Sequence, residues 1–177
     1  MVNQRRPIHL DFEVDKLTNS IENVLTTDVF ATDVLPVSKE DLKNVTKKIG
    51  WVFDWKQEFK QPERDVYKLT IVNNIYVIQG LISLEIKSDH IFMHLVESAP
   101  FNKGKSKVYE GVPGNLVAFA CRQSFRHGYE GNVSFLSKTQ LIDHYTQSLG
   151  AIHIGGHRMI IETQAALRLI NKYFKNK

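Results

Sequence analysis

The chain has 177 residues, of which 42% are hydrophobic and 24% are charged, and its formal net charge is +4. Cys121 is the only cysteine, which excludes a disulfide-stapled protein and a sulfur-rich metal site. The length and the even composition predict a single globular domain over residues 1–177. The small excess of Lys and Arg suits an anionic ligand and argues against a dense nucleic-acid-binding surface.

The N-terminal stretch carries basic residues but lacks the apolar core of a secretion signal. No apolar run in the sequence is long enough to cross a bilayer. We therefore expect a cytoplasmic protein without a membrane partner.

In chain order, the first predicted elements are two helices. Residues 15–26 place Leu17, Ile21, Val24 and Leu25 at helical spacing, and residues 38–49 open with Ser38 followed by Asp41, which is a capping-box signature. Residues 51–59 carry aromatic residues at strand spacing and predict one buried face of a β-ribbon.

A meander of strands and then alternating helices and strands follow. Residues 65–72, 75–86 and 90–97 are rich in β-branched and aromatic residues and predict consecutive, mostly antiparallel strands. The remaining predicted elements are a helix over 114–128, a strand over 131–137, a helix over 139–150, a bent strand or hairpin over 151–162, and a terminal helix over 163–174. The predicted fold class is α/β (α+β).

Two glycine-containing loops compete as phosphate sites. The segment "NKGKS" at 102–106 matches the closing triplet of a nucleotide-triphosphate loop, but Ala99 stands where the first glycine should be and no helix is predicted directly after it. The segment "YEGVPGNL" at 109–116 puts Gly111 and Gly114 immediately before a predicted helix, whose first N–H groups favour an anion. A plain structural turn explains this second loop equally well.

The run from Ile91 to Ile161 resembles the core of the GNAT acetyltransferase superfamily. "IFMHLVESAP" is similar to the central strand of that family, "YEGVPGNLVAFACRQSFRHG" to its pyrophosphate loop and following helix, "GNVSFLS" to the next strand, and "HYTQSLGA" to its last motif. The resemblance implies a mixed, mostly antiparallel sheet flanked by helices, with acetyl-CoA as co-substrate.

The resemblance also implies where acetyl-CoA binds. Its pyrophosphate would lie on backbone N–H groups of Val112, Gly114, Asn115 and Leu116 beside Gly111, with upstream lysines adding charge. Val112 stands where the family has a glycine, Tyr109 where it has Arg or Gln, and Lys138 where an asparagine is common. Pro113 donates no hydrogen bond.

Two residues are predicted to carry out the chemistry. Glu97, at the apolar end of the central strand, is a candidate general base, and its alternative role is to bind substrate or to pair with a lysine. Tyr145 matches the tyrosine of the family's last motif and is a candidate acid for the departing thiolate, with a core tyrosine as the alternative. Cys121 is interpreted as a core residue.

These features predict an acetyl-CoA-dependent N-acetyltransferase that transfers the acetyl group directly to a primary amine. The acceptor is left open among a small amine, a protein amine and an aminoacyl-tRNA, and a homodimer is also left open. A non-catalytic acyl-CoA-binding regulatory domain and a nucleotide-binding module built on "NKGKS" are the alternatives. The pairs His90/His94 and His153/His157 lack a carboxylate or thiolate in a ligand-like pattern, so no metal site is predicted.

Overall fold

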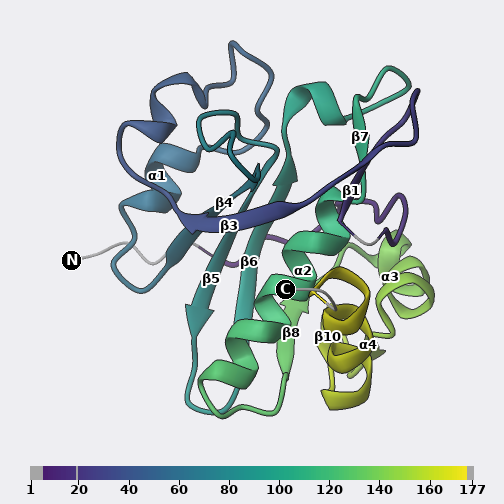
Figure 1. The fold of residues 1–177 in the computed structure, drawn as a ribbon. Helices are drawn as coiled ribbons and strands as arrows, with labels where there is room; N and C mark the ends of the chain where they lie inside the picture. Colours follow the sequence, from purple (N-terminus) through teal and green to yellow (C-terminus); the bar gives the residue numbers. More distant parts are fainter. Residues whose placement is uncertain (1–5, 19, 175–177) are drawn as a thin grey trace.

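The computed structural model describes residues 6–18 and 20–174. In this part of the chain, a seven-stranded sheet has the order β3 (Thr32–Pro36), β4 (Asp65–Ile71), β5 (Gly80–Ile86), β6 (Ile91–Ser98), β8 (Val133–Leu136), β10 (Arg158–Ile161) and β9 (Ile152–His153) (Figure 1). Neighbouring strands are antiparallel except β6 and β8, which are parallel. The predicted mixed, mostly antiparallel sheet is therefore confirmed.

Two long helices cover one face of this sheet. Figure 1 shows α2 (Val112–Arg126) and α4 (Thr163–Phe174) in front of the strands, where they pack against each other. A Cβ at Gly80 would lie 2.7 Å from Cγ1 of Val112, so glycine in β5 lets the first turn of α2 lie directly on the sheet. Helix α3 (Ile142–Leu149) follows a 3₁₀ turn, η3 (Thr139–Leu141). The predicted helices over 114–128, 139–150 and 163–174 are confirmed.

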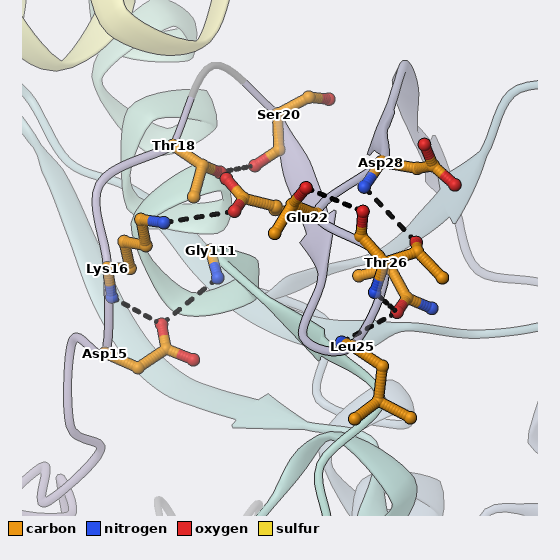
Figure 2. Close-up of polar contacts among 11 residues, drawn as sticks. Asp15, Lys16, Thr18, Ser20, Glu22, Leu25, Thr26, Asp28 and Gly111 are labelled. Carbon is orange, nitrogen blue, oxygen red and sulfur yellow. Dashed lines mark hydrogen bonds and ion pairs between the residues drawn. The ribbon is translucent and has the colours of Figure 1, made fainter.

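The predicted helix over residues 15–26 is wrong in its described part, and Asn19 lies outside the described residues. Here β1 (Ile21–Asn23) pairs with β2 (Val29–Phe30) and β7 (Tyr109–Glu110) in a three-stranded sheet. The side chain of Asn23 accepts hydrogen bonds from the backbone N–H groups of Leu25 and Thr26 (2.9 and 3.0 Å), and Figure 2 shows the resulting turn. Such local bonds compete with helical ones.

The second predicted helix is reduced to a 3₁₀ turn, η1 (Asp41–Asn44). The capping pair does form, because the backbone N–H of Ser38 donates to Asp41 Oδ2 (2.9 Å) and that of Asp41 donates to Ser38 Oγ (3.2 Å). The chain then leaves the helical conformation at Val45, which is buried together with Leu42. Packing of these two side chains overrides the helical pattern.

The predicted β-ribbon over residues 51–59 is also wrong. Residues Trp55–Phe59 form a short helix, α1, because the Asp54 carboxylate accepts from the backbone N–H of Gln57 (3.1 Å) and caps its start. Trp51 and Trp55 are buried as expected, whereas Phe59 is partly exposed. The expected burial is thus confirmed for the two tryptophans and not for Phe59.

The parallel pair β6 and β8 determines where the N-terminal part of the chain lies. These strands pair only at Ile91 with Val133 and at Phe92 with Ser134, and a bulge interrupts the register of β6 with β5 near His94. The chain from Pro7 to Thr18, here called the N-terminal segment, passes behind the sheet in its first part (Figure 1). Its last residues reach α2 and α4, where the carbonyl of Lys16 accepts from Tyr173 and Asp15 accepts from Gly111. No described helix is long and apolar enough to cross a membrane.

Candidate functional site

The gap between β6 and β8 is closed by the N-terminal segment. The backbone N–H of Leu10 donates to the carbonyl of Leu136 (2.7 Å), and the N–H of Lys138 donates to the carbonyl of Leu10 (3.0 Å). Leu10 therefore forms a parallel bridge beside β8, and its side chain is buried. The segment thus extends the sheet where β8 lies apart from β6.

Tyr145 of α3 faces this segment. Its side chain is fully buried, its ring packs on Phe12 and Phe135, and its hydroxyl donates to the carbonyl of Phe12 (2.6 Å). Burial, together with the charges of Asp11 and Glu13, raises the pKa of Tyr145 well above its ordinary value. The hydroxyl therefore keeps its proton at neutral pH and donates into the strand gap.

The start of α2 also contacts the N-terminal segment, through the carboxylate of Asp15. Figure 2 shows Asp15 Oδ1 accepting from the backbone N–H of Gly111 (3.2 Å) and of Lys16 (2.9 Å). Asp15 Oδ2 pairs with Lys107 Nζ (3.1 Å). Gly111 has φ +92°, and a side chain there would overlap Thr18, so only glycine fits. The chain itself thus places an anion at the start of α2.

The other predicted phosphate-binding residues lie in the first turn of α2 and are buried. The N–H of Asn115 already bonds to the carbonyl of Gly111 (3.1 Å), and its side chain donates to Thr32 Oγ1 (2.8 Å). Leu116 packs in the core. In the described residues, the N–H groups of Val112 and Gly114 have no such partner, as expected for the first turn of a helix.

Gly114 is also constrained by packing. A Cβ there would overlap the hydroxyl of Tyr173, and it would lie 3.1 Å from Cδ2 of Leu17. The hydroxyl of Tyr173 in turn donates to the carbonyl of Lys16 (3.3 Å). The glycine is thus required by the fold as it stands, independently of any ligand.

Glu97, the predicted base, is buried at the end of β6, where four donors converge on its carboxylate. Oε2 accepts from the backbone N–H of Val52 (2.7 Å) and from Lys103, while Oε1 accepts from the N–H of Phe53 (3.2 Å) and from Trp55 Nε1 (2.8 Å). A carboxylate offers about four lone-pair sites. In this conformation no site is left for a proton from a substrate.

Two cavities flank the N-terminal segment. The lysine cavity, of about 320 Å³, lies near the start of α2 and is lined by residues that include Asp15, Glu97, Lys103, Lys107 and Pro113. The strand-gap cavity, of about 610 Å³, is lined by residues that include Phe92 and His94 of β6, Phe135 and Leu136 of β8, and Arg158 of β10. The first cavity is lined by two lysines that are paired with carboxylates, Lys103 with Glu97 and Lys107 with Asp15. The second opens where the two parallel strands separate.

Sequence reasoning missed one polar group of the strand-gap cavity. His94 is about 5% exposed, and its Nε2 lies 2.8 Å from Glu85 Oε1. In the described part of the chain, His94 Nδ1 is buried without a hydrogen-bond partner. The sequence does indicate this residue, because His94 stands among apolar residues of a predicted strand. A histidine buried there needs hydrogen-bond partners.

The remaining candidates have structural explanations. The "NKGKS" loop leads into β7 and not into a helix, so it lacks the geometry of a nucleotide-triphosphate loop. Cys121 is fully buried in α2, and burial raises its pKa to about 12, which fits a core residue. Within residues 6–18 and 20–174, no cluster of three or more His, Cys, Asp or Glu side chains could hold a metal ion.

Comparison with known proteins gives a fold. No family model matches the chain, and no curated protein matches it. Mutant forms of the spermidine/spermine N-acetyltransferase SpeG from Vibrio cholerae superpose with a TM-score of 0.55 at 14% identity, over 77% of this chain and 96% of theirs. The same enzyme with manganese ions gives 0.52 at 14%, over 78% and 96%. A chain of the KacTA–DNA complex gives 0.54 at 11%, over 79% and 98%.

The protein therefore has the fold of the GNAT N-acetyltransferases, as the sequence resemblance predicted. At these identities the likeness extends to the fold alone.

The geometry of Glu97 predicts a structural role. Glu97→Gln replaces one acceptor oxygen by an NH₂ group that opposes the donors, so we expect the free energy of unfolding to fall by about 2–3 kcal/mol, as for charged hydrogen bonds. Urea denaturation measures the change. Glu40→Gln, on an exposed carboxylate paired with Lys43, should change it by less than about 0.5 kcal/mol. Equal stability of the Glu97 variant and the parent would contradict this role.

Proposed function

We propose that this protein is an acetyl-CoA-dependent N-acetyltransferase that acts on a primary amine by direct transfer. The observation that carries the proposal is that Tyr145 of α3 and the start of α2 both face the opening between β6 and β8, and that one extended segment contacts both. The segment brings a carboxylate to the helix start and a carbonyl oxygen to Tyr145. Acetyl-CoA carries a pyrophosphate and a thioester carbonyl on an extended arm, so the same donors suit it.

Acetyl-CoA must then displace part of the N-terminal segment. Leu10 anchors the segment by two backbone bonds to β8 and by burial, so the part that moves is the stretch from Phe12 to Lys16. Its release breaks the bonds from Tyr145, from Gly111 and between Val14 N–H and His144 Nε2 (2.9 Å). At about 1 kcal/mol each, these three bonds alone weaken acetyl-CoA binding by roughly a hundredfold. The contacts of Asp15 with Lys107 and of Lys16 with Tyr173 weaken it further.

The roles of the predicted residues follow from this arrangement. Val112 and Gly114 offer the free N–H groups of the first turn, and Gly111 offers a third once Asp15 leaves. Lys103 and Lys107 line the lysine cavity beside them. Tyr145 holds a proton for the departing thiolate. Glu97 fixes the loop of Val52 and Phe53 against the end of β6.

A polyamine is one acceptor class that the fold neighbours suggest, because SpeG is named as a spermidine/spermine N-acetyltransferase. The strand-gap cavity contains both signs of charge, with Glu63 and Glu85 beside Arg64, Lys87 and Arg158. An acceptor with an anionic group in addition to its amine fits this lining better than a pure polycation.

A non-catalytic acyl-CoA-binding domain is the second candidate function, because the N-terminal segment already occupies the gap between β6 and β8.

Binding of acetyl-CoA should be limited by Asp15. Asp15→Ala frees the N–H of Gly111 and the ammonium of Lys107, so we expect the affinity for acetyl-CoA, measured by isothermal titration calorimetry, to rise about tenfold, since a charged hydrogen bond contributes about 1.5 kcal/mol. Asp28→Ala, which removes the same charge from an exposed turn, should leave the affinity unchanged. Weaker binding by Asp15→Ala would show that the segment and acetyl-CoA do not compete. ATP binding without acetyl-CoA binding would exclude the proposed function.

Turnover should depend on the hydroxyl of Tyr145. Tyr145→Phe keeps the ring packing on Phe12 and Phe135 and removes only the proton donor, so we expect kcat to fall roughly 10²–10⁴-fold while acetyl-CoA binds at least as tightly. Thiol release from acetyl-CoA in the presence of primary amines measures kcat. Tyr129→Phe, on a tyrosine outside the strand gap, is the control. Parental turnover by Tyr145→Phe would leave Tyr145 a core residue, and no turnover by the parent with any amine would favour the non-catalytic domain.

A further inference from the structure

The strand-gap cavity contains a carboxylate–imidazole pair on adjacent strands. Glu85 of β5 lies beside His94 of β6, where the bulge turns the histidine toward the cavity, and the rings of His94 and Phe92 are in contact, with centroids 4.6 Å apart. The Nε2–Oε1 distance is 2.8 Å. Since an ionised carboxylate only accepts hydrogen bonds, Nε2 of a neutral His94 carries the proton. Nδ1 is then left with a free lone pair.

Among the buried side-chain atoms of the described residues that lack a hydrogen-bond partner, Nδ1 of His94 is the only imidazole nitrogen. His94 is about 5% exposed, and Nδ1 has no hydrogen-bond partner in the described residues. A buried polar atom without a partner is destabilising, and a catalytic role is one explanation for such an atom. A histidine whose second nitrogen is fixed by a carboxylate is the usual arrangement of a general base.

Burial of His94 favours its neutral form. Burial lowers the pKa of His94 below its ordinary value, against the opposing hydrogen bond from Glu85. Arg64, from the turn after α1, lowers it further, and Glu58 of α1 opposes this. Although burial alone would raise it, the pKa of Glu85 lies below its ordinary value because Lys87 and His94 bind its carboxylate. At neutral pH the pair is therefore Glu85 ionised and His94 neutral.

We propose that His94 is the general base that takes the proton of the acceptor amine, and that Glu85 is its positioning residue. The proposal rests on the proposed N-acetyltransferase function. The amine enters through the strand-gap cavity, and its nitrogen forms a bond to the acetyl carbon as the carbon–sulfur bond breaks. Nδ1 of His94 takes one proton from the amine, and the hydroxyl of Tyr145 gives one to the departing thiolate. Both side chains then return to their starting states by exchange with solvent.

The two sides of the N-terminal segment differ in whether their titratable group has a free hydrogen-bonding site. Glu97, on the lysine-cavity side, has all four lone-pair sites occupied. His94, on the strand-gap side, has one nitrogen oriented and the other free. Only the second group can accept a proton without first losing a hydrogen bond.

The test compares turnover of the parent and of His94→Gln by thiol release from acetyl-CoA, with spermidine, lysine and a lysine-containing peptide as the amines. Acetyl-CoA affinity is measured separately by calorimetry. We expect His94→Gln to bind acetyl-CoA like the parent and to lose roughly 10²–10⁴-fold in kcat, with a smaller loss at high pH, where the amine loses its proton to water. His127→Gln, on an exposed histidine at the end of α2, should match the parent.

Glu85→Gln provides a readout that a merely structural role would not change. Removing this carboxylate lowers the pKa of His94 further, because the carboxylate raises it, so the acidic limb of the kcat profile should move to lower pH. Imidazole nitrogen NMR of the parent should show the proton of His94 on Nε2.

The possible outcomes are distinguishable. Parental kcat in His94→Gln, or a proton on Nδ1 of His94 in the parent, would overturn the assignment while leaving the transferase in place. A parent that binds acetyl-CoA but releases no thiol with any of the three amines would overturn the assignment together with the proposed reaction.

Discussion

The limited pairing of β6 and β8 is the constraint on which the site depends. Two parallel strands that share only the residue pairs Ile91–Val133 and Phe92–Ser134 leave backbone groups of β8 without a sheet partner. Buried backbone groups must be satisfied, and Leu10 satisfies those of Leu136 and Lys138. The N-terminal segment is thus needed for the sheet to be complete, and its position in the gap follows from the same requirement. Under the proposed function, acetyl-CoA has to enter a gap that backbone hydrogen bonds of the sheet hold closed.

The segment and the proposed co-substrate need the same donors. Asp15 at the start of α2 stabilises the fold because the first N–H groups of a helix attract an anion. The carbonyl of Phe12 stabilises it by accepting from Tyr145. Each contact adds to stability and lowers affinity for any molecule that carries an anion and a carbonyl at those places, which is the usual conflict between stability and function. Anchoring by Leu10 limits the conflict, since only the stretch after it must move.

The elements that the sequence predicted well are those whose pattern is local and repeated. The strands near 65–72 and 90–97 and the helix near 114–128 consist mainly of residues that the fold buries. Residues 15–26 failed because a turn around Asn23 offers side-chain bonds that compete with a helix. The alternation of Leu10, Phe12 and Val14 with acidic residues fits an extended chain, in which Leu10 forms an isolated bridge with Ser137. The four donors on Glu97 come from chain segments about 45 residues away in sequence or from a later loop, and no local pattern reveals them.

Two carboxylates, on β5 and β6, differ in the hydrogen bonds that surround them. Glu97 and Glu85 are both acidic residues near strand ends, and the sequence favoured Glu97 because its neighbours are apolar. Burial beside a tryptophan and two backbone N–H groups makes Glu97 an acceptor that holds a loop. Glu85 is less buried, and its Oε1 accepts a hydrogen bond from Nε2 of His94. The other nitrogen of His94 has no hydrogen-bond partner in the described residues. In the proposed mechanism, the proton is taken where a hydrogen-bonding site is left unfilled next to a cavity, and this depends on the number of donors around each group more than on the group itself.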